Sequence, residues 1–295
     1  MSPLIQLARP RTLPLAFAVI CCGNALAYHD GAWHPLVFIL ALLTALSLQV
    51  LSNIANDYGD GIRGTDRARP ASAPRRLTAN GSVSPAYMRR LLVVCTLASL
   101  ALGITLLSVS ALDWSGFLVF LGLGALAITA AITYTVGRCA YGYHALGEIS
   151  VFTFFGLLGV LGSYYLQSGG WHPTLLLPAA GSGLLAAAVL NINNIRDITS
   201  DRAAGKQTLA VKLGFERAKQ FQYILLSAAS CCYLTYALLN QAYTSLLWLL
   251  LLPLVSTHAR ALHRAVDQMS AGCELKRIVS CACGVNLLFS LGLCL

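Results

Sequence analysis

Two stretches of the sequence concentrate acidic and amide side chains in a chain that has few charges. The first is NIANDYGDGIRGTD at residues 53–66, and the second is NINNIRDITSDRAAGKQTLAVKLG at residues 191–214. Asp and Glu account for only 11 of the 295 residues, yet the first stretch alone holds three aspartates. In both stretches an asparagine precedes an aspartate by four residues, as in Asn53–Asp57 and Asn193–Asp197. Side chains four residues apart share one helix face, so each pair is expected on a single face.

Carboxylates at this density predict binding of a divalent cation. Acidic groups that lie close together repel one another, and their pKa values rise unless a cation offsets the charge. Mg²⁺ prefers oxygen ligands and is usually held by one or two carboxylates together with the phosphates of a substrate. Asn53 and Asn193 can add amide oxygens. The predicted acidic ligands are Asp57, Asp60, Asp66, Asp197 and Asp201.

Basic side chains near both stretches suit the phosphate oxygens that a metal leaves uncovered. They are Arg63, Arg138, Arg196, Arg202 and Lys206. The two stretches together therefore predict a site for Mg²⁺ and a diphosphate. The alternative is that both are ordinary solvated helix ends, where Asp and Asn are common. The repetition of the same Asn-x-x-x-Asp spacing favours the site.

The composition predicts that these residues are carried by membrane helices. Hydrophobic residues make up 57% of the chain and charged residues 11%, whereas a soluble domain has about 25% charged residues. The mean hydropathy is +0.69. Nine apolar stretches are long enough to be read as spans: 13–28, 35–54, 91–110, 114–135, 148–167, 174–194, 221–240, 244–260 and 278–294. The first is short, and with Arg9 and Arg11 before it and Ala25-Leu26-Ala27 within it, it also resembles a signal peptide.

The distribution of positive charge predicts the orientation of the spans. All 20 Lys and Arg residues fall in the N-terminal segment and in alternate connections, and the connections near 29–34, 113, 168–172 and 240–243 contain none. The positive-inside rule then places the N-terminus and both acidic stretches in the cytoplasm. Anionic lipid headgroups account for the net charge of +9, so no nucleic-acid partner is expected. The ten cysteines contain no C-x-x-C pair and are expected to be small apolar residues.

The acidic stretches follow the second and sixth predicted spans. Because four spans separate them, both stretches emerge on the same side of the membrane at the same depth. This predicts a weak internal repeat, with halves 1–135 and 136–295, within a single domain that covers residues 1–295.

The quoted stretches resemble the UbiA superfamily of intramembrane prenyltransferases. RPRTLPLA at residues 9–16 and YTVGRCAYGYHALGEISVFTFFG at residues 134–156 add to the resemblance. Its finer features are similar to the branch that prenylates 1,4-dihydroxy-2-naphthoate in menaquinone synthesis. The resemblance implies an all-α bundle of nine transmembrane helices around a central cavity open to lipid. It also implies a bacterial cytoplasmic (inner) membrane, with the active site at the cytoplasmic face.

The resemblance further implies roles for individual residues. The acids of both motifs would bind Mg²⁺ at the diphosphate of a polyprenyl donor and, with two cations, assist its departure: Asp57, Asp60, Asp197, Asp201, Lys206 and Arg138. Residues expected to bind the donor are Asn53, Arg63, Asn193, Arg196, Arg202, Tyr134, Tyr141 and Tyr143. Asp66 belongs to the extended first motif. The loop 134–148 would close over the diphosphate, and the loop 67–80 is richer in Pro and Arg than the family pattern.

The implied reaction joins an allylic carbon to a ring carbon of the hydroxynaphthoate, with loss of CO₂ and diphosphate. The allylic cation needs shielding from water. Aromatic side chains expected to shield it are Phe152, Phe154, Phe155, Tyr164 and Tyr165. Glu148 is a candidate proton acceptor, or alternatively an acid that favours a helix start. Arg9 or Arg138 could pair with the carboxylate of the acceptor.

Three alternatives to this function stay open at this point. A 4-hydroxybenzoate prenyltransferase of ubiquinone synthesis would use the same fold and the same donor. A transporter would carry buried acids near the membrane midplane, where this chain has almost none. A CDP-alcohol phosphotransferase also begins its motif like Asp57-x-x-Asp60-Gly61, but it requires an alanine where this chain has Gly64.

Overall fold

The structure is a computed structural model that describes residues 3–64, 77, 81, 83–138 and 140–295, and the described part is helical without strands. Within it, eight helices are long and apolar enough to cross a membrane. A ninth, shorter apolar helix coincides with the first predicted span. The all-helical membrane fold is thereby confirmed, whereas the number of crossings and their orientation stay predictions. The predictions for Asp66 and, apart from Leu77, for the loop 67–80 lie outside the described residues.

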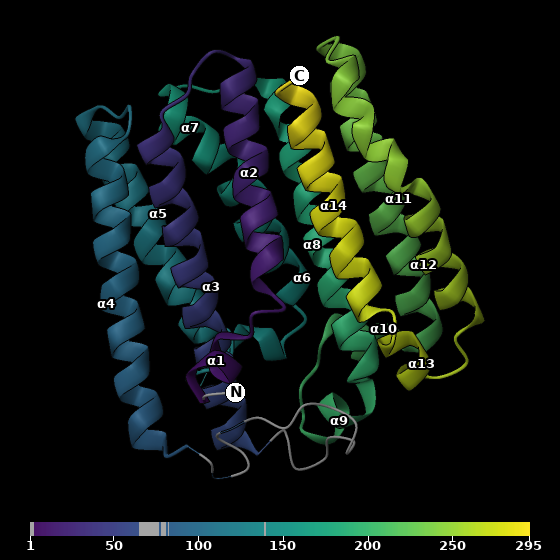
Figure 1. The fold of residues 1–295 in the computed structure, drawn as a ribbon. Helices are drawn as coiled ribbons and strands as arrows, with labels where there is room; N and C mark the ends of the chain where they lie inside the picture. Colours follow the sequence, from purple (N-terminus) through teal and green to yellow (C-terminus); the bar gives the residue numbers. More distant parts are fainter. Residues whose placement is uncertain (1–2, 65–76, 78–80, 82, 139) are drawn as a thin grey trace.

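The nine apolar helices account for most of the chain (Figure 1). Several are built from more than one helical segment. They are α2 (Leu13–His29), α3 (Pro35–Arg63), α4 (Pro85–Val109), α5 (Trp114–Thr133), α6–η3–α7 (Gly147–Val151, Phe152–Gly162 and Ser163–Ser168), η4–α8 (Pro173–Leu175 and Leu176–Arg196), α11 (Phe215–Leu239), η5–α12 (Tyr243–Leu251 and Leu252–Arg264) and α13–α14 (Gln268–Gly272 and Leu275–Leu293). Short helices complete the fold: α1 (Pro3–Ala8), η2 (Tyr141–Tyr143), α9 (Ile198–Ala203) and α10 (Leu209–Leu213).

Helix α3 continues well past the predicted end of its span. It begins at Pro35, whose fixed φ suits the first turn of a helix, and it stops only where Gly64 adopts a left-handed conformation with φ 69°. Gly59 and Gly61, which also belong to the acidic stretch, lie within the helix and do not end it. A Cβ atom at Gly59 would lie 2.6 Å from the Thr135 hydroxyl, so this glycine allows close packing. As a result, Asp57 and Asp60 lie on a regular helix and share one face.

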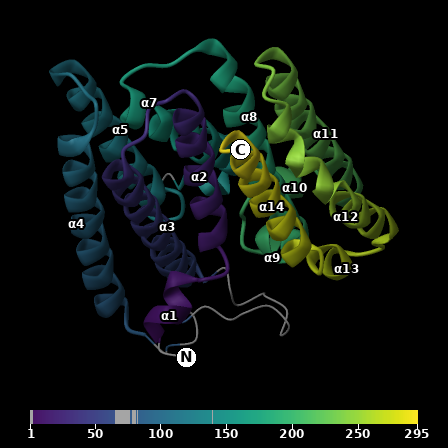
Figure 2. The same cartoon turned by 45° about the horizontal axis from the view of Figure 1, so that its top comes forward.

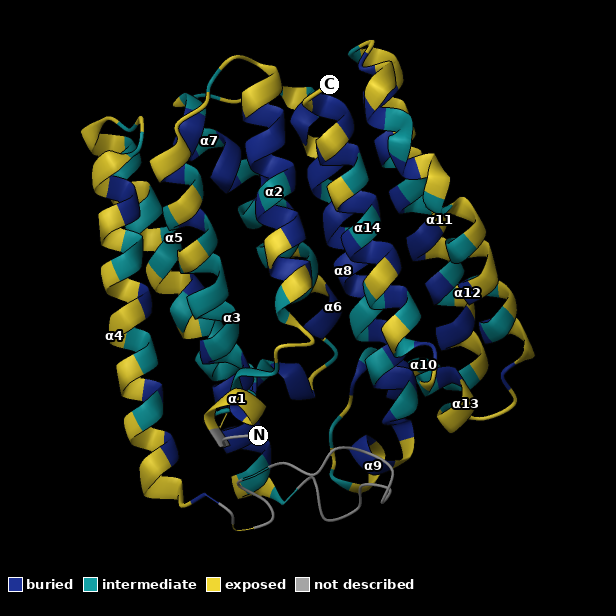
Figure 3. Ribbon diagram, in the orientation of Figure 1, coloured by how far each residue is buried: buried dark blue, intermediate teal, exposed yellow. Residues whose placement is uncertain are grey.

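The helices pack as two groups that meet at α2. Helices α3, α4 and α5 pack together, and α8 lies at the centre of a second group with η3, α11 and α14. Helix α2 contacts both α3 and α14, and Figure 2 shows it between them. The main apolar core belongs to the second group, and Figure 3 shows α2 and α14 among the most buried segments. The outer faces of α4 and α5 remain exposed and apolar, as expected for contact with lipid.

Glycines bring the fifth span against its neighbours. The segment Phe152–Gly162 is a π-helix that crosses α8 at Gly156 and Gly183. A Cβ atom at Gly156 would lie 2.5 Å from the Ala179 carbonyl oxygen and 2.7 Å from the Cα atom of Gly183. Small residues at membrane-helix crossings allow such close backbone contact, and here they fix how η3 sits on α8.

The ends of the helices that lie away from the acidic stretches carry their own polar and aromatic residues. We call this end the far end, and the end that carries Arg63 and Arg196 the acidic end. At the far end Tyr164 Oη donates to Asp30 Oδ2 at 2.7 Å. The exposed Trp114 begins α5, and the exposed Trp33 and Trp171 lie in connections at this same end. Tyr164 therefore lies away from the acids, and its predicted role as a shield for the allylic cation is wrong.

Replacing Gly156 by Ala is expected to destabilise the protein by roughly 1–3 kcal/mol, because the new methyl group meets backbone rather than a movable side chain. Thermal unfolding in detergent measures the effect. Gly122→Ala is the matched control, since no heavy atom lies within 4 Å of a Cβ atom built at Gly122 in α5. Equal melting temperatures for the two variants would contradict the proposed role of the crossing.

Candidate active site

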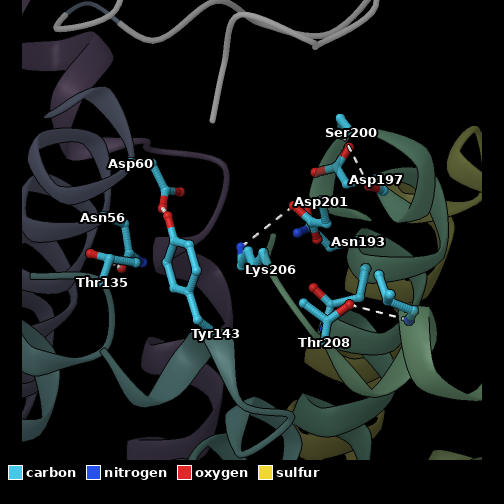
Figure 4. A network of polar contacts seen from close by, with 12 residues as sticks. Asn56, Asp60, Thr135, Tyr143, Asn193, Asp197, Ser200, Asp201, Lys206 and Thr208 are labelled. Atoms are coloured by element: carbon cyan, nitrogen blue, oxygen red, sulfur yellow. Dashed lines mark hydrogen bonds and ion pairs between the residues drawn. The ribbon is translucent and has the colours of Figure 1, made fainter. Parts of the chain in front are cut away.

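The first acidic group is carried by the last turns of α3. Asp57 and Asp60 are 4% and 2% exposed, so their carboxylates are held within the protein. Tyr143 Oη donates to Asp60 Oδ1 at 2.7 Å (Figure 4). Next to this pair, the Thr135 hydroxyl donates to Asn56 Oδ1 at 3.2 Å. The loop after α5 is thereby joined to the acidic end of α3.

The second acidic group lies at a break between α8 and α9. The spacing of Asn193 and Asp197 predicted that both lie on one face of a helix, but α8 ends at Arg196 and α9 begins at Ile198. Asp197 and Asp201 remain less than one-tenth exposed, at 3% and 7%. The Asp201 amide still donates to the Asp197 carbonyl at 2.8 Å, so the break changes the direction of the chain and keeps the acids adjacent.

Cations accompany the second group closely. Arg196 donates from Nε to Asp197 Oδ1 at 2.8 Å and from Nη2 to Asp197 Oδ2 at 2.7 Å. The same Nη2 donates to Asn193 Oδ1 at 2.9 Å, so one guanidinium holds two of the predicted site residues. Lys206 Nζ lies 3.7 Å from Asp201 Oδ1. This arrangement offsets part of the negative charge that burial makes costly.

Tyr143 connects the two acidic groups. Its hydroxyl binds Asp60, and its carbonyl oxygen accepts a hydrogen bond of 3.0 Å from the Gln207 amide, next to Lys206. The Arg63 guanidinium carbon lies 4.3 Å from the centroid of the Tyr143 ring, and Lys206 Nζ lies 5.6 Å from it. Figure 4 shows Tyr143 and Lys206 between Asp60 on one side and the Asp197–Asp201 pair on the other. Cations on an aromatic face are attracted by its electrons, so this ring also positions Arg63 and Lys206.

Tyr134 supports this loop from the end of α5. Its carbonyl oxygen accepts from the Gly142 amide at 3.0 Å, and its ring meets that of Tyr141 edge-on at 5.2 Å. Gly142 and Gly147 lie so close to the Tyr134 ring and hydroxyl that a Cβ atom at either would come within 3 Å. Burial and, after it, the charge of Glu148 raise the pKa of Tyr134 well above its usual range. The hydroxyl therefore stays protonated and able to donate a hydrogen bond.

Two other residues predicted to belong to the site, Asn53 and Tyr141, make hydrogen bonds to groups other than the aspartates. Asn53 Nδ2 donates to the Ala8 carbonyl at 2.9 Å and to the Thr12 hydroxyl at 3.0 Å, which ties the N-terminal segment to α3. The Tyr141 hydroxyl donates to the Ala130 carbonyl at 3.0 Å. Arg138 and Arg202 are exposed. The Asn53 amide nitrogen is thus bonded to the N-terminal segment rather than to the aspartates.

The aspartates form two separate pairs. Among the residues that the structure describes, no three His, Cys, Asp or Glu side chains lie close enough to hold one metal ion. Each pair supplies two carboxylates, from α3 in one case and from α8–α9 in the other. Mg²⁺ commonly takes one or two carboxylates and completes its shell with water and substrate phosphates, so pairs of this kind fit it.

The sequence profile of the UbiA prenyltransferase family matches residues 15–277, which is most of the chain. This chain belongs to the UbiA prenyltransferase family. The resemblance noted from the motifs is thus confirmed. The transporter and CDP-alcohol phosphotransferase alternatives are set aside, because the match covers all the helices that position the acids.

Two curated proteins are similar to the chain over nearly its full length. It is 45% identical over 290 residues to 1,4-dihydroxy-2-naphthoate octaprenyltransferase of Escherichia coli (strain K12), covering 98% of this chain and 94% of that protein. It is also 45% identical over 291 residues to the protein of the same name from Haemophilus influenzae, with the same coverage. A solved structure of a UbiA homolog from Archaeoglobus fulgidus bound to GPP and Mg²⁺ covers 99% of both chains, with a TM-score of 0.66 and 17% identity. At that identity the likeness shows a UbiA fold.

Removing the Tyr143 hydroxyl is expected to slow prenyl transfer by about 10-fold or more, since a hydrogen bond to a charged group contributes roughly 1.5–3 kcal/mol. Tyr143→Phe keeps the ring that Arg63 and Lys206 contact. Initial rates with saturating substrates measure the effect.

Tyr164→Phe provides the matched control, because Tyr164 makes the same kind of hydrogen bond to Asp30, also 2.7 Å long, at the far end. This control should transfer at the wild-type rate. A Tyr143→Phe protein as fast as the control would show that the bond to Asp60 does not matter for the reaction.

Proposed function

We propose that this protein transfers a polyprenyl group from an allylic polyprenyl diphosphate to 1,4-dihydroxy-2-naphthoate. Diphosphate and CO₂ leave, and the product is the demethylmenaquinone skeleton. The observation that carries this proposal is the 45% identity to two enzymes of that name over nearly the whole chain. The two aspartate pairs joined through Tyr143 support it, because they suit a diphosphate donor.

The aspartate pairs are proposed to hold Mg²⁺ against the donor diphosphate. Asp57 and Asp60 form one ligand pair, and Asp197 and Asp201 form the other. Bound Mg²⁺ supplies charge neutralisation to the departing diphosphate. The UbiA homolog from Archaeoglobus fulgidus binds GPP together with Mg²⁺, which supports the choice of metal.

Three further residues are proposed to act on the donor directly. Arg63 and Lys206, which both lie over the Tyr143 ring, add positive charge for the phosphate oxygens that the metal leaves uncovered. Tyr134 is able to donate a hydrogen bond because its hydroxyl stays protonated. Arg196 acts on the donor indirectly, since its hydrogen bonds to Asp197 and Asn193 hold those two side chains in place.

The membrane sets the direction in which the donor lies. The acids occur where α3 and α8 reach the acidic end, and the rest of both helices is apolar. A diphosphate head at the acids lets the prenyl chain follow the apolar helices, where each buried CH₂ contributes about 0.8 kcal/mol. The exclusive occurrence of Lys and Arg on one side of the predicted spans supports a cytoplasmic site in a bacterial inner membrane.

A transfer assay tests the acceptor. The protein in liposomes is supplied with octaprenyl diphosphate, Mg²⁺ and either 1,4-dihydroxy-2-naphthoate or 4-hydroxybenzoate, and products are identified by mass. Prenylated product with release of CO₂ is expected from the naphthoate alone. Product from the benzoate alone would move the protein to ubiquinone synthesis, and no product from either with folded protein would overturn the proposal.

Loss of either aspartate pair is expected to reduce transfer by at least about 100-fold, because charge stabilisation in a water-poor site contributes several kcal/mol. Asp57→Asn and Asp197→Asn test the two pairs. EDTA should stop the wild-type reaction and added Mg²⁺ should restore it.

Asp113→Asn is the matched control for these variants. Asp113 caps α5 at the far end by accepting from the Gly116 amide at 2.7 Å, and an asparagine caps a helix equally well. This variant should retain full activity. Transfer that persists in EDTA would exclude the proposed metal role.

A further inference from the structure

Glu148 is a buried acid that the donor site does not use. It lies in the first turn of α6 and is 5% exposed. Asn194 Nδ2 donates to its Oε1 atom at 2.9 Å. Its Oε2 atom is buried and accepts no hydrogen bond from any residue that the structure describes. Burying a carboxylate oxygen without a hydrogen-bond donor costs free energy, so an acid in this state within an apolar span indicates a functional role.

The position of Glu148 relative to the acids follows from Asn194. Asn194 lies three residues before Asp197 in α8, which is about one helical turn farther from the acidic end. Because Glu148 is bonded to Asn194, it lies about one turn deeper in the protein than the second acidic pair. Beside Glu148, the Gly147 backbone approaches the Tyr134 hydroxyl, with 2.8 Å between that oxygen and a Cβ atom built at Gly147. Glu148 therefore lies between the acids and the apolar layer.

The proposed position of the donor puts its reactive carbon at this same depth. The allylic carbon is bonded to the diphosphate, which the acids hold, and the prenyl chain beyond it enters the apolar layer. The ring that attacks this carbon must lie beside it within a few ångströms. With the donor in the proposed position, a carboxylate at this depth would be within reach of the acceptor, whereas the aspartates would face the phosphates.

We propose that Glu148 is the general base of the reaction: its Oε2 atom takes the proton of the acceptor hydroxyl that neighbours the reacting ring carbon. The inference rests on the proposed function. Asn194 fixes the other carboxylate oxygen, which orients Oε2, and general bases act within hydrogen-bond reach of the proton that they remove. An uncharged amide at this position could not perform the step.

The proposed step balances without an external oxidant or reductant. The donor C–O bond breaks, and its electron pair leaves with the diphosphate. The ring carbon that bears the carboxylate forms the new C–C bond while the neighbouring hydroxyl gives its proton to Glu148 and becomes a carbonyl. The bond to CO₂ then breaks, its electron pair restores the aromatic ring, and the oxygen takes the proton back from Glu148.

Glu148→Gln tests the step, because a glutamine can keep the bond to Asn194 but cannot accept the proton. Transfer to 1,4-dihydroxy-2-naphthoate is expected to fall by about 100-fold or more, the usual effect of losing a general base. Binding of the donor and acceptor-independent release of diphosphate should stay within about twofold. A fluorinated, electron-poor acceptor has a hydroxyl that is already ionised at the assay pH and needs no base. The variant and the wild type should therefore prenylate this acceptor at the same rate.

Two further variants complete the design. Glu148→Asp retains a carboxylate on a side chain one methylene shorter. It is expected to transfer the prenyl group faster than Glu148→Gln. The aspartate variant therefore tests the role of the general base even where the glutamine variant folds poorly. Glu216→Gln is the control for an acid-to-amide change, since Glu216 is exposed and paired only with Lys219 among the described residues, far along the chain from Glu148.

Several outcomes would overturn the role of Glu148. They are wild-type transfer by Glu148→Gln, equal rates for the aspartate and glutamine variants, and a matching loss of diphosphate release, which would assign Glu148 to stabilising the cation. Failure of the wild type to prenylate the naphthoate would overturn the proposed function itself, and the inference with it.

Discussion

The hydrogen bond from Tyr143 to Asp60 is the contact on which the rest of the acidic end depends. It joins the loop that follows α5 to an acid 83 residues earlier in the chain. The Tyr143 carbonyl oxygen also accepts a hydrogen bond from the Gln207 amide, so Tyr143 connects the two acidic groups. Gly59 and Gly142 make this possible, because each lets a backbone approach where a side chain would collide. The placement of Arg63 and Lys206 follows from the ring that they share.

A chain of buried polar contacts crosses the second group of helices. Asn191 Nδ2 donates to Gln222 Oε1 at 2.9 Å, and Gln222 Nε2 lies 3.3 Å from His258 Nε2. His258 Nδ1 contacts Glu274, which accepts from Arg277. This chain of contacts joins α8, α11 and α12 to the segment before α14, so it fixes their rotation about their own axes. Its first member, Asn191, precedes Asn193 by two residues on α8.

The helical membrane fold and the family could be predicted from the sequence, because both depend on local information. Apolar length predicts helices, and Asn-x-x-x-Asp spacing predicts which faces carry acids. Contacts through space were not predictable in the same way. Nothing in the spacing indicates that Asn53 holds the N-terminal segment, that α8 breaks at Asp197, or that Glu148 pairs with Asn194. The role predicted for Tyr164 is wrong because the distance of this residue from the acids depends on its position along the span, and it lies beside Asp30 at the far end. The division into two repeat halves stays a prediction.

The positions of the tryptophans determine which part of the molecule intrinsic tryptophan fluorescence can probe. Of the four in the chain, Trp33, Trp114 and Trp171 lie exposed at the far end, and Trp248 is buried beside Tyr233. The acidic end carries tyrosines instead. Intrinsic tryptophan emission therefore senses the bilayer boundary remote from the aspartates and responds little to events among them. Spectroscopy of ligand binding will need a fluorophore introduced near the acidic end.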